Sequence, residues 1–243
     1  MIFVTGANGQ LGCELQLLLD KKATFLTRAE LDLSNLRQVE EFLAKNDITT
    51  LINTAAYTLV DKAEIELELS DLINHQAPNL MAKYAEKKKF KFINFSSDYV
   101  FDGTSNTAYT EENKRAPINA YGKTKADSEE DVMSLCPDSL IIRTSWVYSQ
   151  FGKNFVKTIL KAGSEKDELK VVNDQIGTLT WAKELAEITL KASDADLKGI
   201  YNFSGEGCST WYDVAVYLKE LSGFKAVVYP VSSASYPTAA RMI

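Results

Sequence analysis

The sequence has 243 residues, of which 45% are hydrophobic and 25% charged, and its formal net charge is −6. This composition is that of an ordinary globular protein, and the negative charge argues against broad binding to the phosphate backbone of nucleic acid. No apolar run approaches the roughly 18 residues that a membrane span needs, and the N-terminus has no signal-peptide pattern. We therefore expect a cytoplasmic protein without nucleic-acid or membrane partners.

The cysteines and the single histidine limit which kinds of metal site and catalytic mechanism the sequence can support. Cys13, Cys136 and Cys208 have no CxxC spacing, so a disulfide framework or a zinc site is not expected. The single histidine, His75, lies in a helical pattern with no nucleophile signature beside it. A Ser-His-Asp hydrolase or a histidine-based metal centre would depend on that residue. We expect acid–base chemistry that runs without histidine.

Strand and helix patterns alternate over the first 145 residues. A short apolar run at residues 1–5 leads into a glycine turn, 6–12, and then into leucines at helical spacing. Further predicted strands cover residues 25–27, 50–53, 90–95 and 140–144, and predicted helices cover 36–46, 64–72, 71–86 and 120–135. This alternation is typical of βαβ units and predicts an α/β fold with a Rossmann-type, doubly wound parallel sheet.

The alternation of predicted strands and helices is less regular after residue 146. Helical patterns cover residues 154–162 and 182–192, and strand patterns cover 171–172, 200–203 and 227–229. We interpret residues 1–145 as a dinucleotide-binding domain and residues 146–243 as mainly a small substrate-binding lobe. Segments of about residues 175–200 are expected to return to the first domain.

The glycine turn is a candidate phosphate cradle. Gly6, Gly9 and Gly12 are spaced three residues apart, follow a strand and open a helix. Glycine permits the tight turn and lets a pyrophosphate approach the backbone, and the helix N-terminus supplies free N–H donors. A glycine-rich turn alone is a weak signal, but its place at the first βα junction makes it considerably stronger.

The end of the second strand bears on cofactor choice. An acid there would bind the adenosine ribose hydroxyls, but the sequence reads Phe25-Leu26-Thr27-Arg28. Arg28 is either an ordinary surface arginine or a partner for a 2′-phosphate. On the second interpretation NADPH is the cofactor, with NADH also accepted.

Tyr121 and Lys125 are the candidate reaction centre. Their four-residue spacing places both on one face of the helix predicted at 120–135. A tyrosine pKa near 10 is too high for efficient proton exchange at neutral pH, and a nearby ammonium would lower it. Upstream, Ser97 and Asp98 follow a buried strand, where open parallel sheets bind their ligands. The alternative is that these two residues only cap a turn.

Together these segments resemble the extended short-chain dehydrogenase/reductase family, and within it the dTDP-4-dehydrorhamnose reductases. The resemblance runs almost from end to end. It rests on eight strings in the right order: GANGQLGCELQ, AAYTLVDKAE, SSDYVFDGT, INAYGKTKADSEE, IIRTSWVYS, NFVKTIL, VVNDQIGTLT and STWYDVA.

The resemblance implies a role for each matching residue. Tyr121 would donate the proton, Lys125 would bind the nicotinamide ribose, and Ser97 would stand where the family usually has a threonine that tunes the tyrosine. Asp98 and Trp146 would contact the substrate, Trp146 by packing against the deoxysugar ring. The remaining matches are to cofactor-binding positions: Gly6, Gly9, Gln10, Leu11 and Gly12 at the phosphates, Asp32 and Leu33 near the adenine, and Ala55, Ala56, Tyr57 and Thr58 beside the nicotinamide. The implied reaction reduces dTDP-4-dehydro-L-rhamnose to dTDP-L-rhamnose, the last step of dTDP-rhamnose biosynthesis. A homodimer is also implied.

The sequence departs from the family in two places. The segment 236–241 matches the start of a TPxxRPxxS-like stretch, after which the family continues into a tail that would help build the substrate lobe. Some members hold magnesium between subunits through glutamates. Glu14 matches one such position, but Lys183 stands at another, so we predict no metal.

Two other functions stay open at this point. A related sugar-nucleotide epimerase or dehydratase would share the cofactor site, although dehydratases tend to have an acid where Tyr99 stands. A non-catalytic NADP-binding regulatory subunit, resembling the methionine adenosyltransferase beta subunit, would also carry a YGKTK-type string. The segments 144–148 and 174–177 are more similar to the reductases.

Overall fold

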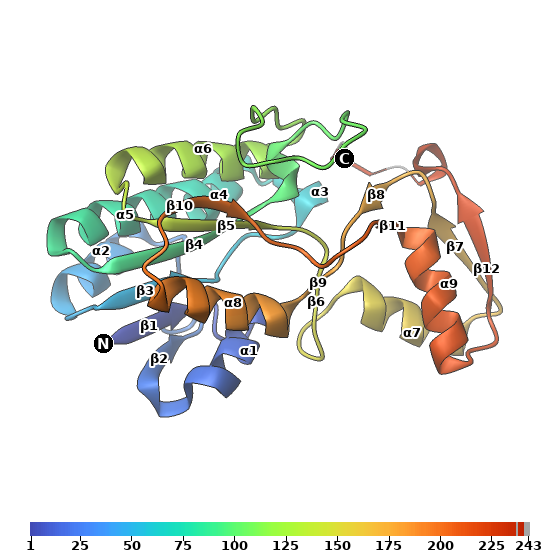
Figure 1. The fold of residues 1–243 in the computed structure, drawn as a ribbon, viewed down its shortest axis with the longest axis horizontal. Helices are drawn as coiled ribbons and strands as arrows, with labels where there is room; N and C mark the ends of the chain where they lie inside the picture. The colour runs from blue at the N-terminus through green and yellow to red at the C-terminus, as the bar shows by residue number, and fades with distance from the viewer. Residues whose placement is uncertain (237, 241–243) are drawn as a thin grey trace.

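A six-stranded parallel sheet forms the larger part of the molecule, and a smaller lobe lies at one end (Figure 1). This computed structural model describes residues 1–236 and 238–240. The strand order is β10-β5-β4-β3-β1-β2, and every neighbouring pair is parallel. The strands are β1 (Ile2–Thr5), β2 (Ala23–Leu26), β3 (Thr50–Asn53), β4 (Lys91–Ser97), β5 (Leu140–Thr144) and β10 (Gly199–Asn202).

Helices cover both faces of this sheet. Side chains alternate along each strand, so Phe3 and Leu51 enter one core layer while Val4 and Ile52 enter the other. The first layer is closed by α2 (Leu36–Lys45), α5 (Ala77–Lys88) and α6 (Ala120–Leu135), and the second by α1 (Gln10–Leu19) and α8 (Ala182–Asp194). The predicted doubly wound Rossmann-type fold is thereby confirmed.

The connection from β3 to α5 differs from the sequence prediction. A helix was expected over residues 64–72, but the structure has α3 (Val60–Ala63), α4 (Leu67–Asp71) and a π-helical turn, η2 (Leu72–Gln76). The turn directs the buried amide of Asn74 at the backbone of Tyr57. This amide is hydrogen-bonded to both the N–H and the C=O of Tyr57. π-helical turns of this kind are frequent at functional sites.

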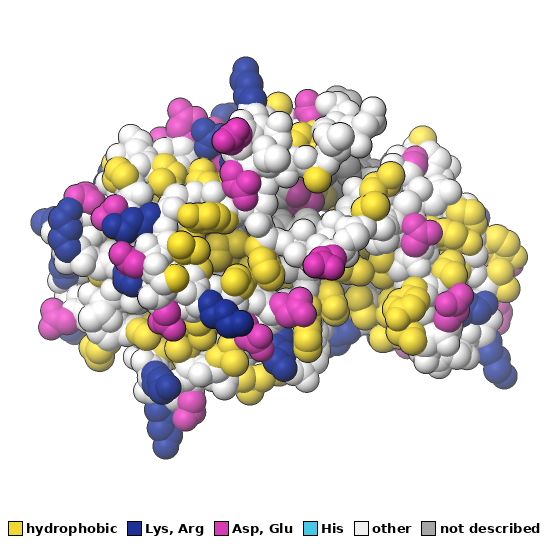
Figure 2. Space-filling model, in the orientation of Figure 1, with side chains coloured by type: hydrophobic (Ala, Val, Ile, Leu, Met, Phe, Trp, Pro, Cys, Tyr) yellow, Lys and Arg dark blue, Asp and Glu magenta, His cyan; other side chains and the backbone are white. Residues whose placement is uncertain are grey.

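The smaller lobe has its own core. Strands β7 (Glu168–Val172) and β12 (Val227–Val231) pair in parallel, and α7 (Phe155–Glu165) and α9 (Trp211–Ser222) pack beside them around Ile159 and Ala215. Figure 2 shows hydrophobic side chains gathered over this lobe, where Tyr217 and Leu221 are exposed. The remaining elements are η1 (Asp20–Lys22), η3 (Asp98–Val100), β6 (Val147–Tyr148), β8 (Ile176–Gly177), β9 (Thr180–Trp181), β11 (Ser209–Thr210) and η4 (Ser233–Ser235).

Helix α9 was not predicted from the sequence, although the sequence contains the residues that cap its N-terminus. Thr210 accepts from the N–H of Asp213, and the Asp213 carboxylate accepts from the N–H of Thr210, which is a complete capping box. The helix ends at Gly223, whose φ of 70° suits glycine. No helix in the described part of the chain is long and apolar enough to cross a membrane.

His75 ties η2 to α6. Its Nδ1 lies 2.8 Å from Oδ1 of Asp71, and its Nε2 lies 3.0 Å from Oδ2 of Asp131. Gln76 also donates to Asp71, and Asn79 to Asp131. Burial lowers the pKa of His75, but the hydrogen bonds to the two carboxylates outweigh it, so the net shift of the pKa is upward.

A raised pKa in the folded state makes His75 a pH-dependent source of stability. Its contribution is fully present below the unfolded-state pKa near 6.5 and is lost as pH rises through the higher folded-state value. We expect His75→Gln to lower the free energy of unfolding more at pH 6 than at pH 9, as measured by urea denaturation of both proteins. A difference between wild type and variant that is the same at both pH values would contradict this role.

Candidate active site

The predicted site residues lie at one edge of the sheet, where the strands end. This is the crevice in which open parallel sheets bind ligands, next to the reversal of strand order between β1 and β3. The structure places Gly6–Gly12 after β1, Arg28, Asp32 and Leu33 after β2, Ala55–Thr58 after β3, Ser97 and Asp98 at the end of β4, Trp146 after β5, and Tyr121 and Lys125 in the first turns of α6.

The turn after β1 has the shape of a phosphate cradle. Gly6 has a φ of 68°, and a β-carbon there would lie 2.7 Å from the backbone nitrogen of Ala55. Gly9 caps α1 without any side-chain hydrogen bond to the first-turn N–H groups. The helix N-terminus therefore keeps donors and a partial positive charge for an anion. A dinucleotide pyrophosphate fits this turn.

The adenosine end carries an exposed ion pair. Nε of Arg28 lies 3.2 Å from Oδ2 of Asp32, and the Arg28 side chain is 68% exposed. Burial would raise the pKa of Asp32, but hydrogen bonds from Ser34 and Arg28 outweigh it and lower the pKa. Because an exposed pair of this kind is weak, the guanidinium is available to a stronger anion.

The segment predicted to lie beside the nicotinamide is fixed at the backbone of Tyr57 by Asn74. Oδ1 of Asn74 accepts from the N–H of Tyr57 at 2.9 Å, and Nδ2 of Asn74 donates to the carbonyl of Tyr57 at 3.0 Å. The Tyr57 hydroxyl donates to Oε2 of Glu66 at 2.7 Å. Burial and this carboxylate raise the pKa of Tyr57 to about 12. Asn74 was not predicted as a site residue, because the sequence shows it only as a polar residue on a helix face that packs inward.

Tyr121 presents a protonated phenol. The residue is 9% exposed, and its ring meets Tyr99 edge-to-face with 5.5 Å between centroids. Burial and the charge of Asp98 raise the pKa of Tyr121, and a hydrogen bond with Ser97 offsets part of that rise. The expected lowering of this pKa by Lys125 is therefore not what the structure shows. A proton donor is what a carbonyl reduction needs.

Lys125 is buried one helical turn away. Its Nζ donates to the carbonyl of Phe95 at 3.0 Å. Burial lowers the pKa of Lys125 to about 8, and the nearby Glu129 opposes that shift. The ammonium is bonded to a neutral carbonyl, so it keeps two N–H donors for other acceptors.

Ser97 caps the turn after β4, as one of the two interpretations predicted, while a role in ligand binding stays a prediction. The Ser97 hydroxyl accepts from the N–H of Tyr99 and caps η3, and it donates to Oδ1 of Asp98 at 2.6 Å. Burial raises the pKa of Asp98 to about 6. Gly122 permits this arrangement, since a β-carbon there would collide with the carbonyl of Tyr99.

Trp146 is held between two protein surfaces. Its indole stacks on Trp211 with centroids 3.5 Å apart, and a β-carbon on Gly177 would lie 2.5–2.9 Å from three adjacent indole atoms. Its φ of 43° is unusual for a residue with a side chain. Trp211 and Gly177 thus limit the surface of the Trp146 indole that is open to a ligand, and the packing of a sugar ring against Trp146 stays a prediction. Trp211 was not recognised as part of this site.

Comparison with known proteins places this site in a family. The model of the RmlD substrate binding domain matches residues 1–242. A dTDP-4-dehydrorhamnose reductase of Aggregatibacter actinomycetemcomitans is 35% identical over 256 residues, covering 99% of this chain and 87% of that protein. The chain belongs to the dTDP-4-dehydrorhamnose reductase family.

Solved structures of the family agree with this assignment. A dTDP-4-dehydrorhamnose reductase from Clostridium acetobutylicum superimposes with a TM-score of 0.95 at 38% identity, and one from Bacillus anthracis in complex with NADP does so with a TM-score of 0.95 at 36% identity. Each alignment covers 99% of this chain and 87% of the other. The resemblance inferred from the sequence is confirmed. The matched segment 236–241 lies partly outside the described residues, since Pro237 and Arg241 are among those not described.

The family position Glu14 is turned inward in this reductase. Its side chain is 2% exposed and accepts a hydrogen bond from the hydroxyl of Ser149 at 2.6 Å. Lys183 instead lies over the ring of Trp181. Within the described residues, no three histidine, cysteine or acidic side chains are grouped as metal ligands.

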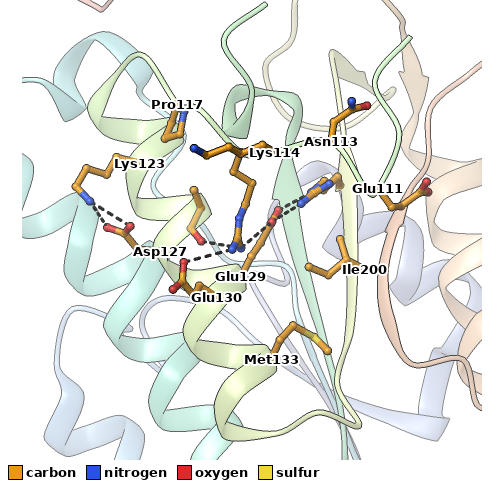
Figure 3. Close-up of a pocket in the computed structure, with 13 residues that line it drawn as sticks. Glu111, Asn113, Lys114, Pro117, Lys123, Asp127, Glu129, Glu130, Met133 and Ile200 are labelled. Carbon is orange, nitrogen blue, oxygen red and sulfur yellow. Dashed lines mark hydrogen bonds and ion pairs between the residues drawn. The ribbon is translucent and has the colours of Figure 1, made fainter.

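A cavity of about 680 Å³ lies between α6, the 111–117 loop and β10. Figure 3 shows Glu129 of α6 within it and the ion pair of Lys123 with Asp127 at its rim. Glu129 is 1% exposed and binds the guanidinium of Arg143 through two hydrogen bonds of 2.8 and 2.7 Å. Neither Tyr121 nor Lys125 is among the described residues that line this cavity.

The buried Glu129–Arg143 pair is one turn beyond Lys125, so it anchors the catalytic helix to β5. Glu129→Gln would leave Arg143 buried without a counter-charge, which costs about 3–5 kcal/mol of unfolding free energy. Glu130→Gln is the matched control, because Glu130 is 74% exposed and pairs with the outer Arg115; about 0–1 kcal/mol is expected there. Equal losses for the two variants in urea unfolding would refute the anchoring role.

Proposed function

We propose that this chain reduces dTDP-4-dehydro-L-rhamnose to dTDP-L-rhamnose with NADPH. The observation that carries the proposal is the buried phenol of Tyr121, at the same sheet edge as the glycine cradle and one helical turn from the buried Lys125. Family membership and the relative in complex with NADP support both the reaction and the cofactor.

The residues divide the work between binding and proton transfer. When bound, the reduced nicotinamide supplies the hydride for the sugar carbonyl. The cradle at Gly6, Gly9 and Gly12 binds the pyrophosphate, and the free donors of Lys125 bind the nicotinamide ribose. Tyr121 donates its proton to the carbonyl oxygen as negative charge develops there.

Ser97, Asp98 and the smaller lobe are proposed to bind the substrate. Ser97 contacts the Tyr121 phenol and is bonded to Asp98, so the two residues place polar groups around the reacting oxygen. We propose that residues 146–243 mainly bind the nucleotide sugar and that residues 1–145, with α8 and β10, bind the cofactor. The edge of Trp146 contributes to the sugar pocket from the lobe side.

The cellular location and the oligomeric state of the enzyme are proposed as follows. We propose that the enzyme acts in the cytoplasm, which fits the three free cysteines of the described chain. Assembly as a homodimer stays a prediction that sedimentation velocity would check. Turnover without net loss of NADPH would favour an epimerase or dehydratase, and NADPH binding without any turnover would favour a regulatory subunit.

Tyr121→Phe tests the proton donor. Removing the hydroxyl leaves the ring packed against Tyr99, so the variant is expected to fold and bind NADPH. The rate of NADPH oxidation with dTDP-4-dehydro-L-rhamnose should fall about 100- to 10,000-fold. Tyr84→Phe removes a hydroxyl on α5 that donates to Glu40 and should leave the rate unchanged. A Tyr121→Phe variant with wild-type kcat would contradict the assignment.

Arg28→Ala tests the choice of cofactor. A guanidinium bonded to a 2′-phosphate contributes roughly 1.5–3 kcal/mol, so the KM for NADPH should rise about tenfold or more while the KM for NADH stays the same. Arg37→Ala removes a similar exposed arginine, paired with Glu41 on α2, and should change neither KM. If Arg28→Ala raises the two KM values equally, Arg28 does not bind the 2′-phosphate.

A further inference from the structure

The helix that begins at the phosphate cradle also contacts the segment that leads into the substrate lobe. Gln10 is the first residue of α1, and its Nε2 donates to the carbonyl of Val147 at 3.2 Å. Its Oε1 accepts from Nδ2 of Asn154 at 2.9 Å. Both partners are more than 130 residues away in the chain, so this one side chain joins the cofactor domain to the lobe.

Asn154 makes further hydrogen bonds within the lobe. Its Nδ2 also donates to the carbonyl of Ser149 at 2.7 Å, and its Oδ1 accepts from the N–H of Lys157 at 3.0 Å, which caps α7. A single amide is therefore bonded to the cofactor helix, to the connecting segment and to the first helix of the lobe. Displacing Gln10 would displace the start of α7.

A second link lies one turn further along α1. The Ser149 hydroxyl donates to the buried Glu14 carboxylate at 2.6 Å and accepts from the N–H of Phe151 at 3.1 Å. Gly152 has a φ of 62°, and a β-carbon there would lie 3.1 Å from Cγ of Gln10. The connecting segment thus follows the surface of α1 closely and has little freedom to move independently of it.

We propose that Asn154 is a positioning residue that transmits cofactor binding to the substrate lobe. A pyrophosphate on the free N–H groups of the first α1 turn would fix the Gln10 backbone. The Gln10 side chain then fixes Asn154, and Asn154 fixes α7. This inference rests on the proposed function for its consequence in catalysis, because the lobe must hold the sugar within hydride-transfer distance of the nicotinamide, where a displacement of about 1 Å is costly.

Thermodynamic reciprocity gives the proposal a second consequence. If bound cofactor orders the lobe, the nucleotide sugar binds more tightly to the cofactor complex than to the free protein, and by the same factor in reverse. Couplings of this type are usually about 5- to 150-fold. The side chain of Asn154 is bonded to the side chain of Gln10 and to the backbone of Ser149 and Lys157, so its loss should remove the coupling and leave cofactor affinity intact.

Asn154→Ser is the informative variant. Serine is as good a helix N-cap as asparagine, so α7 stays capped while the two bonds donated by Nδ2 are lost. Asn35→Ser is the matched control, because Asn35 caps α2, a helix of the larger domain, through its Oδ1.

The first readout is hydrogen–deuterium exchange of residues 149–158, measured for each protein with and without saturating NADP⁺. We expect NADP⁺ to slow exchange in this segment about fivefold or more in the wild type and in Asn35→Ser, and to have no effect there in Asn154→Ser. The Kd for NADP⁺ should be the same in all three. Protection of the segment in Asn154→Ser, or its absence in the wild type, would overturn the proposal. So would a weakened Kd for NADP⁺ or a loss of folding confined to Asn154→Ser, since either result would make the role structural.

The second readout separates this proposal from the proposed reaction. The Kd of dTDP-L-rhamnose should be at least about fivefold lower with NADP⁺ than without it in the wild type, and the same with and without it in Asn154→Ser. If the wild type does not bind dTDP-L-rhamnose at all, the proposed function fails, whereas the exchange measurement still decides the link between α1 and α7.

Discussion

The close approach of Gly6 to the chain after β3 is the constraint on which the site depends. Any β-carbon at Gly6 would meet the backbone of Ala55, so only glycine lets the turn after β1 lie against the neighbouring connection. This contact brings the first turn of α1 and the wall at Ala55–Thr58 to the same sheet edge. Asn74 then fixes Tyr57 within that wall. A dinucleotide can lie across this edge because backbone, rather than side chains, forms its floor.

A second constraint is electrostatic. Tyr121, Lys125 and Glu129 occupy successive turns of one face of α6, and all three are buried. Burial keeps the phenol protonated and lowers the lysine pKa to about 8. The Glu129–Arg143 pair holds the same helix against β5. The acid and the cation of the site are therefore positioned by a helix that is anchored through an ion pair, outside the region where substrate would bind.

Much of this could be predicted from the sequence, for identifiable reasons. The helix at α6 and the strands β3 and β5 were predicted with the bounds that the structure shows, because apolar runs, capping residues and periodicity agree there. The glycine turn and the Tyr121–Lys125 pair are short-range patterns and were found for that reason. Trp211, Gly177 and Asn74 act through contacts with residues far away in the chain, and no local pattern reveals such contacts. The pKa of Tyr121 was predicted to fall because the spacing shows a nearby ammonium, but the spacing does not show that the phenol is buried and lies close to the Asp98 carboxylate.

Hydride delivery to carbon 4 of the sugar is the central claim, and isotope transfer tests it directly. NADPH deuterated at the transferred position of the nicotinamide would be incubated with dTDP-4-dehydro-L-rhamnose and the wild-type protein, and the product would be examined by NMR. We expect dTDP-L-rhamnose with deuterium at carbon 4, one atom for each NADPH oxidised. A product without deuterium at that carbon, or no product from a folded protein that binds NADPH, would contradict it.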